Sequence, residues 1–200
     1  MILFNLFKRN KKDSTDWKKE CRKYRKKYET LLKEPWLRTQ VCLDYAVPIK
    51  ILEDFIPVMD QSEIETVCMI HELNLEFMER FYEIINWEYL SRNDTLSPQV
   101  IRKYYTELKP YISNILKTVG KVLPIDIIEM FDVDTYGRQI CVYCTSLDEK
   151  YITSHDDKLP KSILACKLYA GAFNVSDEFR SRYYANYSDN VKLLYNEGDK

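Results

Sequence analysis

Glycine is scarce in this sequence, with 4 residues in 200, and histidine is scarcer still, with 2. Tight turns between short strands draw heavily on glycine, so its scarcity argues against a β-sandwich or barrel and favours long helices. No Ser/His/Asp set, phosphate-binding glycine loop or dinucleotide fingerprint is present. So few histidines and glycines leave little material for the common catalytic sites, which favours a non-enzymatic role.

Two kinds of targeting segment are also missing. The apolar run Ile2–Phe7 is too short for a signal peptide and precedes the basic residues instead of following them. No stretch is long enough to span a membrane. The 6 cysteines, of which Cys42 and Cys68 sit among apolar neighbours, are therefore expected to be thiols in a reducing, cytoplasmic compartment.

The charge is strongly divided along the chain, although the net charge is only -1. Residues 1–33 contain twelve Lys/Arg and four Asp/Glu, a balance of +8, and the remainder contains 18 basic and 27 acidic residues, a balance of −9. This asymmetry predicts a basic N-terminal arm, residues 1–34, ahead of a single helix-rich domain, residues 35–200. The arm would meet an anionic partner, or it would dock on its own acidic body.

The arm combines an apolar tip with a basic amphipathic helix. The tip residues, which would enter a partner's groove or a membrane surface, are Ile2, Leu3, Phe4, Leu6 and Phe7. The residues at heptad spacing are Trp17, Cys21, Tyr24, Tyr28 and Leu31. The other faces hold the basic residues Lys18, Lys19, Arg22, Lys23, Arg25, Lys26 and Lys27. Such a helix can bind nucleic acid, an anionic membrane or an acidic helix, or it can simply stay in solvent.

The stretch from Ser62 to Arg92 has no glycine and no proline, and its apolar residues recur at helical spacing over a wide arc. A helix with so wide an apolar surface must be covered on more than one side. The sequence therefore predicts a mainly α fold, a helical bundle around one long central helix. A further helix is expected to start at Ser97 and Pro98 and to stop at Gly120.

The residues from 125 to 154 have a different character, with short runs rich in β-branched and aromatic residues and an Asp134–Gly137 turn. This pattern predicts a small antiparallel β-meander that packs on the helices, which makes the fold α+β. Neither an internal repeat nor a low-complexity tract is evident.

One group of residues has the chemistry of a metal site: Cys141, Cys144, His155 and Cys166. A Cys₃His zinc site is chemically possible. On a strand, however, Cys141 and Cys144 would face opposite sides, so packed cysteines are the favoured interpretation and no cofactor is expected.

Three weaker patterns also admit structural explanations. The Asp132–Gly137 segment starts like a calcium loop but has Tyr143 at the position of the bidentate glutamate, so a turn explains it better. The His155–Asp156 pair is typical of metal phosphohydrolases, but the only other histidine, His71, lies on an apolar stripe. Tyr183 and its aromatic neighbours could stack on bases, but a core stripe is favoured.

These observations lead to three hypotheses. The first is a non-enzymatic interaction protein or assembly subunit that binds another protein and uses its arm on an anionic partner. The second is a nucleic-acid-binding accessory protein that uses residues 1–33. The third is a zinc-dependent enzyme or zinc-stabilised domain.

Overall fold

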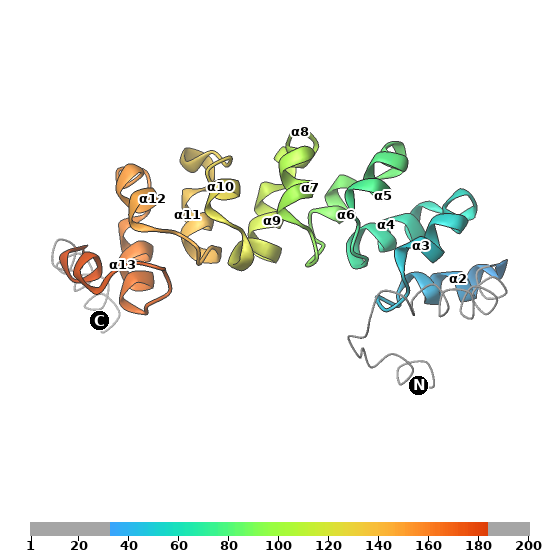
Figure 1. Cartoon of the computed structure of the whole chain (residues 1–200), viewed down its shortest axis with the longest axis horizontal. Coiled ribbons are helices and arrows are strands. Elements are labelled where there is room, and N and C mark those ends of the chain that lie inside the picture. Colours follow the sequence, from blue (N-terminus) through green and yellow to red (C-terminus); the bar gives the residue numbers. More distant parts are fainter. Residues whose placement is uncertain (1–32, 184–200) are drawn as a thin grey trace, which may run out of the picture. The chain divides into compact units, whose positions relative to one another are not determined.

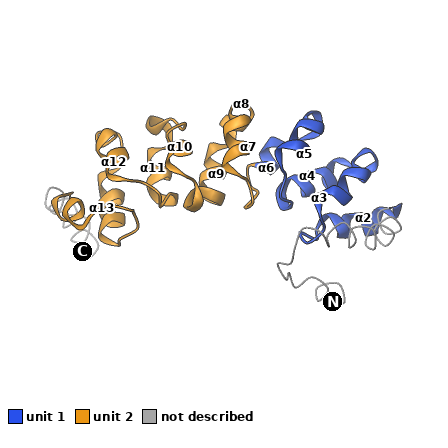
Figure 2. Cartoon of the chain, in the orientation of Figure 1, with its two compact units in different colours: residues 1–90 blue, residues 91–200 orange. Residues whose placement is uncertain are grey.

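The computed structural model describes residues 33–183, and every regular element in that range is helical. The chain divides into two compact units, residues 1–90 and residues 91–200 (Figure 2). The mainly α prediction is confirmed. The apolar tip and the basic helix of the arm lie outside the described residues, so the arm boundary at residue 34 stays a prediction.

Unit 1 is built from short helices joined by tight connections (Figure 1). They are α2 (Pro35–Cys42), α3 (Ile49–Leu52), the 3-10 helix η1 (Glu53–Val58), α4 (Gln61–Ile70), α5 (Leu75–Arg80), η2 (Tyr82–Ile84) and α6 (Trp87–Leu90). Within the unit α4 packs against both α2 and α6. Its core includes Leu52, Phe77, Met78 and Leu90, all buried.

Unit 2 repeats this construction. Its helices are α7 (Pro98–Lys103), α8 (Tyr105–Leu108), η3 (Lys109–Tyr111), α9 (Ile112–Val119), η4 (Gly120–Val122), α10 (Ile125–Ile128), α11 (Val133–Tyr143), α12 (Glu149–Ser154) and α13 (Lys161–Tyr169). Residues 177–183 are helical as well. Helix α11 packs between α9 and α13, and α10 packs on α7. Helices α9, α11 and α13 lie side by side in Figure 1.

From α3 onward the helices form successive hairpins, and a repeated sequence pattern underlies them that the sequence analysis did not detect. The first helix of each hairpin is α3, α5, α7, α10, α12 or the helix at residues 177–183. Each of these helices is preceded by an aliphatic residue, the anchor, which is buried in all but the last hairpin; the anchors are Val47, Leu73, Leu96, Leu123, Leu147 and Val175. Four residues later comes a buried apolar residue, namely Ile51, Phe77, Val100, Ile127, Tyr151 or Phe179. Eight residues after the anchor stands an aromatic ring, namely Phe55, Phe81, Tyr104, Phe131, His155 or Tyr183.

The residue after each anchor begins the helix. The side chains of Asn74, Ser97, Asp148 and Ser176 each accept a hydrogen bond from the backbone N–H three residues on, at 2.8, 3.3, 2.7 and 3.1 Å. Proline takes this place at Pro48 and Pro124. Caps and prolines are the two usual ways to start a helix, so every hairpin has a local start signal.

Hydrogen bonds between successive hairpins show the same period. Within unit 2, Tyr105 Oη donates to the carbonyl of Met130 at 2.6 Å, 25 residues away. Lys167 Nζ donates to the Val142 carbonyl at 2.8 Å, again 25 residues away. Contacts at this separation join successive hairpins within unit 2, which is the organisation of a helical repeat protein.

The predicted long central helix is wrong. The stretch from Ser62 to Arg92 is divided among α4, α5, η2 and α6. The backbone of His71 is extended, with φ −89° and ψ 148°, and Asn74 caps a new helix that begins at Leu75. The apolar residues of this stretch cover a wide arc on a single helical projection because α4, α5 and α6 are separate helices, and each buries a different face.

The predicted β-meander at residues 125–154 is also wrong, since the described residues contain no strand. The segment forms α10, α11 and α12 instead. In α11 the buried residues are Val133, Gly137, Ile140 and Cys141, a helical spacing. Over a few residues the β-branched side chains fit a strand pattern as well as a helical one. Over the whole segment the spacing of the buried residues fits only a helix.

Candidate interaction surface

The outward face of α2 exposes large apolar side chains. Arg38, Val41 and Cys42 face the interior of unit 1, and Trp36 and Leu43 lie on the opposite side of the helix. Trp36 is 68% exposed, Leu43 48%, and Tyr45, just after the helix, 74%. Trp and Tyr are the residues most often found at the centre of protein interfaces. We call Trp36, Leu43 and Tyr45 the α2 surface.

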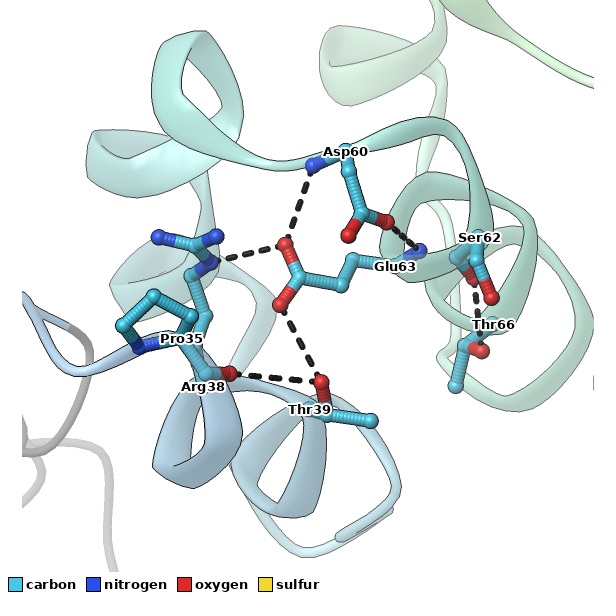
Figure 3. Close-up of polar contacts among 7 residues, drawn as sticks. All are labelled: Pro35, Arg38, Thr39, Asp60, Ser62, Glu63 and Thr66. Atoms are coloured by element: carbon cyan, nitrogen blue, oxygen red, sulfur yellow. Dashed lines mark hydrogen bonds and ion pairs between the residues drawn. The ribbon is translucent and has the colours of Figure 1, made fainter.

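A buried ion pair fixes α2 on α4 (Figure 3). Arg38 Nε donates to Glu63 Oε2 at 2.7 Å, and Thr39 Oγ1 donates to the other carboxylate oxygen at 3.3 Å. Glu63 also accepts from the backbone N–H of Asp60 at 3.0 Å, and the Asp60 side chain accepts from the Glu63 N–H at 2.9 Å. One glutamate therefore closes the capping box of α4 and holds α2.

A second buried glutamate joins the next hairpins of unit 1. Glu53 lies 3.2 Å from Lys50 and 3.2 Å from Arg80, and Lys50 also lies 2.9 Å from the exposed Glu76. These hydrogen-bonded ion pairs raise the pKa of Lys50 and lower the pKa of Glu76.

Unit 1 is strongly acidic beyond its N-terminal segment. Residues 34–90 contain twelve Asp/Glu and only three Lys/Arg, a balance of −9. The three cations are Arg38, Lys50 and Arg80, and each is engaged in the ion pairs above. Residues 91–200 contain fifteen of each sign, a balance of zero. The acidic excess of the protein thus lies in the unit that bears the α2 surface.

The candidate zinc ligands occupy different environments in unit 2. Cys141 is buried on α11, and Cys144 is buried at the C-cap of that helix. Cys166 is exposed on α13. His155 is the C-cap of α12, and its ring packs on Tyr151 with centroids 4.4 Å apart. Among residues 33–183, no three His, Cys, Asp or Glu side chains gather as metal ligands would.

The two buried thiols near α11 are held in the protonated form. Burial raises the pKa of Cys141 and of Cys144 to about 12. Both lie beside Tyr151, whose pKa burial and the two thiols also raise. A thiol with so high a pKa is a poor nucleophile, and both side chains are packed in the interior of unit 2.

The other weak patterns have structural explanations. The turn predicted at Asp132–Gly137 is wrong, since Asp134–Gly137 lie within α11. Asp132 is the N-cap of this helix, and its carboxylate accepts from the Asp134 N–H at 3.2 Å. His71 is buried, and its Nε2 lies 2.8 Å from the carbonyl oxygen of Cys42. Tyr183 is buried with its hydroxyl donating to Asp156 at 2.6 Å, the core position favoured over base stacking.

A shallow depression lies beside α13 in unit 2. Its volume is about 370 Å³, and its lining residues are Ser162, Ile163, Cys166 and Lys167. Tyr169, on the same side of the helix as Cys166, is 77% exposed. This face is apolar but open, and it contains no group of opposed polar side chains that would orient a small molecule.

The predicted partner-binding residues of the tip and basic helix, from Ile2 to Tyr28, lie outside the described residues. The α2 surface, which follows them in the sequence, was not predicted from the sequence, although a signal was present. Trp36 and Leu43 are seven residues apart, out of phase with Val41 and Cys42, and this phase places them on the opposite face.

In the part of the chain that the structure describes, no helix is long and apolar enough to cross a membrane. No protein-family model, curated protein or solved structure matches this chain.

Proposed function

We propose that this protein is a non-enzymatic protein–protein interaction subunit of a larger assembly. The observation that supports the proposal is the α2 surface: a tryptophan on α2, a leucine at its C-cap and a tyrosine just after it are exposed, and a buried ion pair holds α2 in place. Exposed apolar side chains of this size on a rigid element are typical of binding surfaces.

The acidic character of unit 1 indicates the chemistry of what binds there. A surface that combines aromatic side chains with excess carboxylates suits an amphipathic helix with a basic face, which would place apolar residues on the α2 surface and its cations near the carboxylates. In the same way, the basic arm suits an anionic surface. Zinc chemistry and catalysis find no comparable support in the described residues.

The proposal is tested by capturing partners from the cells that make this protein. Wild type is compared with the triple variant Trp36→Ala, Leu43→Ala and Tyr45→Ala. A matched control replaces the exposed Val122 and Tyr169 of unit 2 by Ala. All three side chains of the test variant are exposed, so the fold should be retained, which circular dichroism checks.

We expect a protein that is captured stoichiometrically by wild type and by the control, and that is lost with the triple variant. If all three chains capture the same proteins, the α2 surface is not the binding site. A nuclease treatment before capture addresses the second hypothesis. If nuclease releases the partners, the chain is a nucleic-acid-binding accessory protein that uses residues 1–33.

A further inference from the structure

The N-terminal segment and unit 1 are complementary in charge. Residues 1–33 have a balance of +8, residues 34–90 a balance of −9, and residues 91–200 a balance of zero. The sequence alone shows only that the rest of the chain is acidic. The division into units shows that the whole acidic excess lies in the unit to which the basic segment belongs.

The chain connection also keeps the basic segment beside α2. Residues 17–31, which bear the heptad pattern, are separated from Pro35 by only residues 32–34. If residues 17–31 form the helix that their heptad spacing predicts, a connection this short allows that helix to lie antiparallel to α2. It also gives the segment a high effective concentration at α2, on the order of millimolar for a short tether.

In such an antiparallel pair, the predicted heptad positions would be in register with Trp36 and Leu43. Residues at equal distances from the turn meet in an antiparallel pair, which places Leu31 opposite Trp36 and Tyr24 opposite Leu43. By the same count Arg22 would fall at the level of Tyr45, with Cys21 and Trp17 farther out. Trp36 and Leu43 thus each have an apolar counterpart in the segment, and Tyr45 does not.

We infer that residues 17–31 bind in cis to the α2 surface as an antiparallel helix, with their basic residues toward the carboxylates of unit 1. This inference rests on the proposed function and names the anionic partner of the arm as the chain's own unit 1. Any external protein that binds the α2 surface must then displace this segment, so the arm acts as an intramolecular competitor.

The experiment is chemical crosslinking of the full chain. Cys21 and Cys166 are first replaced by Ser. The remaining cysteines, Cys42, Cys68, Cys141 and Cys144, are buried with pKa values raised to about 11 or 12, so they react slowly with maleimides.

One variant then has Tyr24→Cys with Leu43→Cys, and the matched control has Lys26→Cys with Leu43→Cys. Lys26 lies on the opposite face of the heptad helix from Tyr24, at nearly the same chain distance from Leu43. Both chains are treated with a short bismaleimide at low protein concentration. Intact mass measures the internal crosslink, and a denaturing gel measures dimers.

We expect the Tyr24→Cys pair to form an internal crosslink several-fold faster than the Lys26→Cys pair, with the difference reduced at high salt. Equal rates would mean a segment that does not dock through its heptad face. Crosslinked dimers in place of internal crosslinks would mean docking on a second copy. The absence of either crosslink would mean no docking, and each of these three results overturns the inference.

The crosslinking result and the capture result are independent. If the Tyr24→Cys pair shows no preference but the triple variant loses its partner, the proposed function stands and the inference fails. If the crosslink forms but capture is unchanged, the segment docks in cis and the proposed function fails.

Discussion

The substitution Glu63→Gln tests whether the buried ion pair holds unit 1 together. Glutamine keeps the size of the side chain and can still close the capping box at the third position of α4, so the start of the helix is preserved. What is removed is the charge that compensates Arg38, whose side chain is 11% exposed. The variant therefore isolates the electrostatic part of the contact between α2 and α4.

The expected loss follows from the burial of both groups. Removal of one partner of a buried pair costs about 3–5 kcal/mol, because the remaining charge is left uncompensated. Some access of water to Arg38 places the expected loss at the lower end, about 3 kcal/mol. The double variant Arg38→Met with Glu63→Gln removes both charges and keeps the capping box, so it should recover most of that loss, because no uncompensated charge is left buried.

Urea unfolding followed by tryptophan fluorescence reports on unit 1, because all 3 tryptophans, Trp17, Trp36 and Trp87, lie within residues 1–90. The control is Glu76→Gln, whose side chain is 74% exposed in its pair with Lys50 and which should change stability little. A loss for Glu63→Gln as small as that of the control would refute the role given to the pair.

Three further predictions concern the core, a buried histidine and a helix cap. Phe77→Ala should cost roughly 3–5 kcal/mol in the same unfolding assay, since Phe77 is buried, and a loss below about 1 kcal/mol would show that its site is not a packed core. Burial lowers the pKa of His71 below its usual 6.5, so the unfolded chain takes up the proton first as the pH falls. Stability should therefore decrease from about pH 7 toward pH 5.5, and His71→Gln should remove that decrease; an unchanged pH dependence would contradict the account. Asp148→Ala removes the N-cap of α12 and should lower the free energy of unfolding by about 1 kcal/mol, measured by urea unfolding followed by circular dichroism. An unchanged free energy of unfolding would mean that the cap is not formed.

Local start and stop signals were predicted well from the sequence. Ser97 and Pro98 begin α7 as expected, and α9 ends at Val119, with Gly120 at its C-cap. The single helix expected between these signals is wrong, because the stretch is divided among α7, α8, η3 and α9. Pro48 likewise marks a helix boundary, since it stands between α2 and α3. Such signals depend on the chemistry of one or two residues, and distant parts of the chain do not alter them.

The repeat was missed because its spacing is irregular and its residues vary. Successive anchors are 26, 23, 27, 24 and 28 residues apart. The ring position is filled by phenylalanine, tyrosine or histidine, and the capping position by asparagine, serine, aspartate or proline. The residues at each position of the repeat have similar physical roles but differ in identity, so a comparison of residue types does not detect the repeat.

The sheet was mispredicted because α10 and α12 are each only a turn or two long. In a window of that length, residues such as Ile127 and Ile152 satisfy a strand pattern as well as a helix pattern. The contacts that decide between them come from neighbouring hairpins about 25 residues away.

The most direct test of the central claim is a binding measurement on the α2 surface. A synthetic peptide of residues 13–34 is titrated into the full chain in which Trp17, Tyr24 and Leu31 are replaced by Ala, so that the chain's own segment no longer competes. The account predicts saturable binding with one peptide per chain, weakened by salt and abolished when Trp36, Leu43 and Tyr45 are also replaced by Ala. Absence of binding, or binding that persists after the α2 surface is removed, would contradict it.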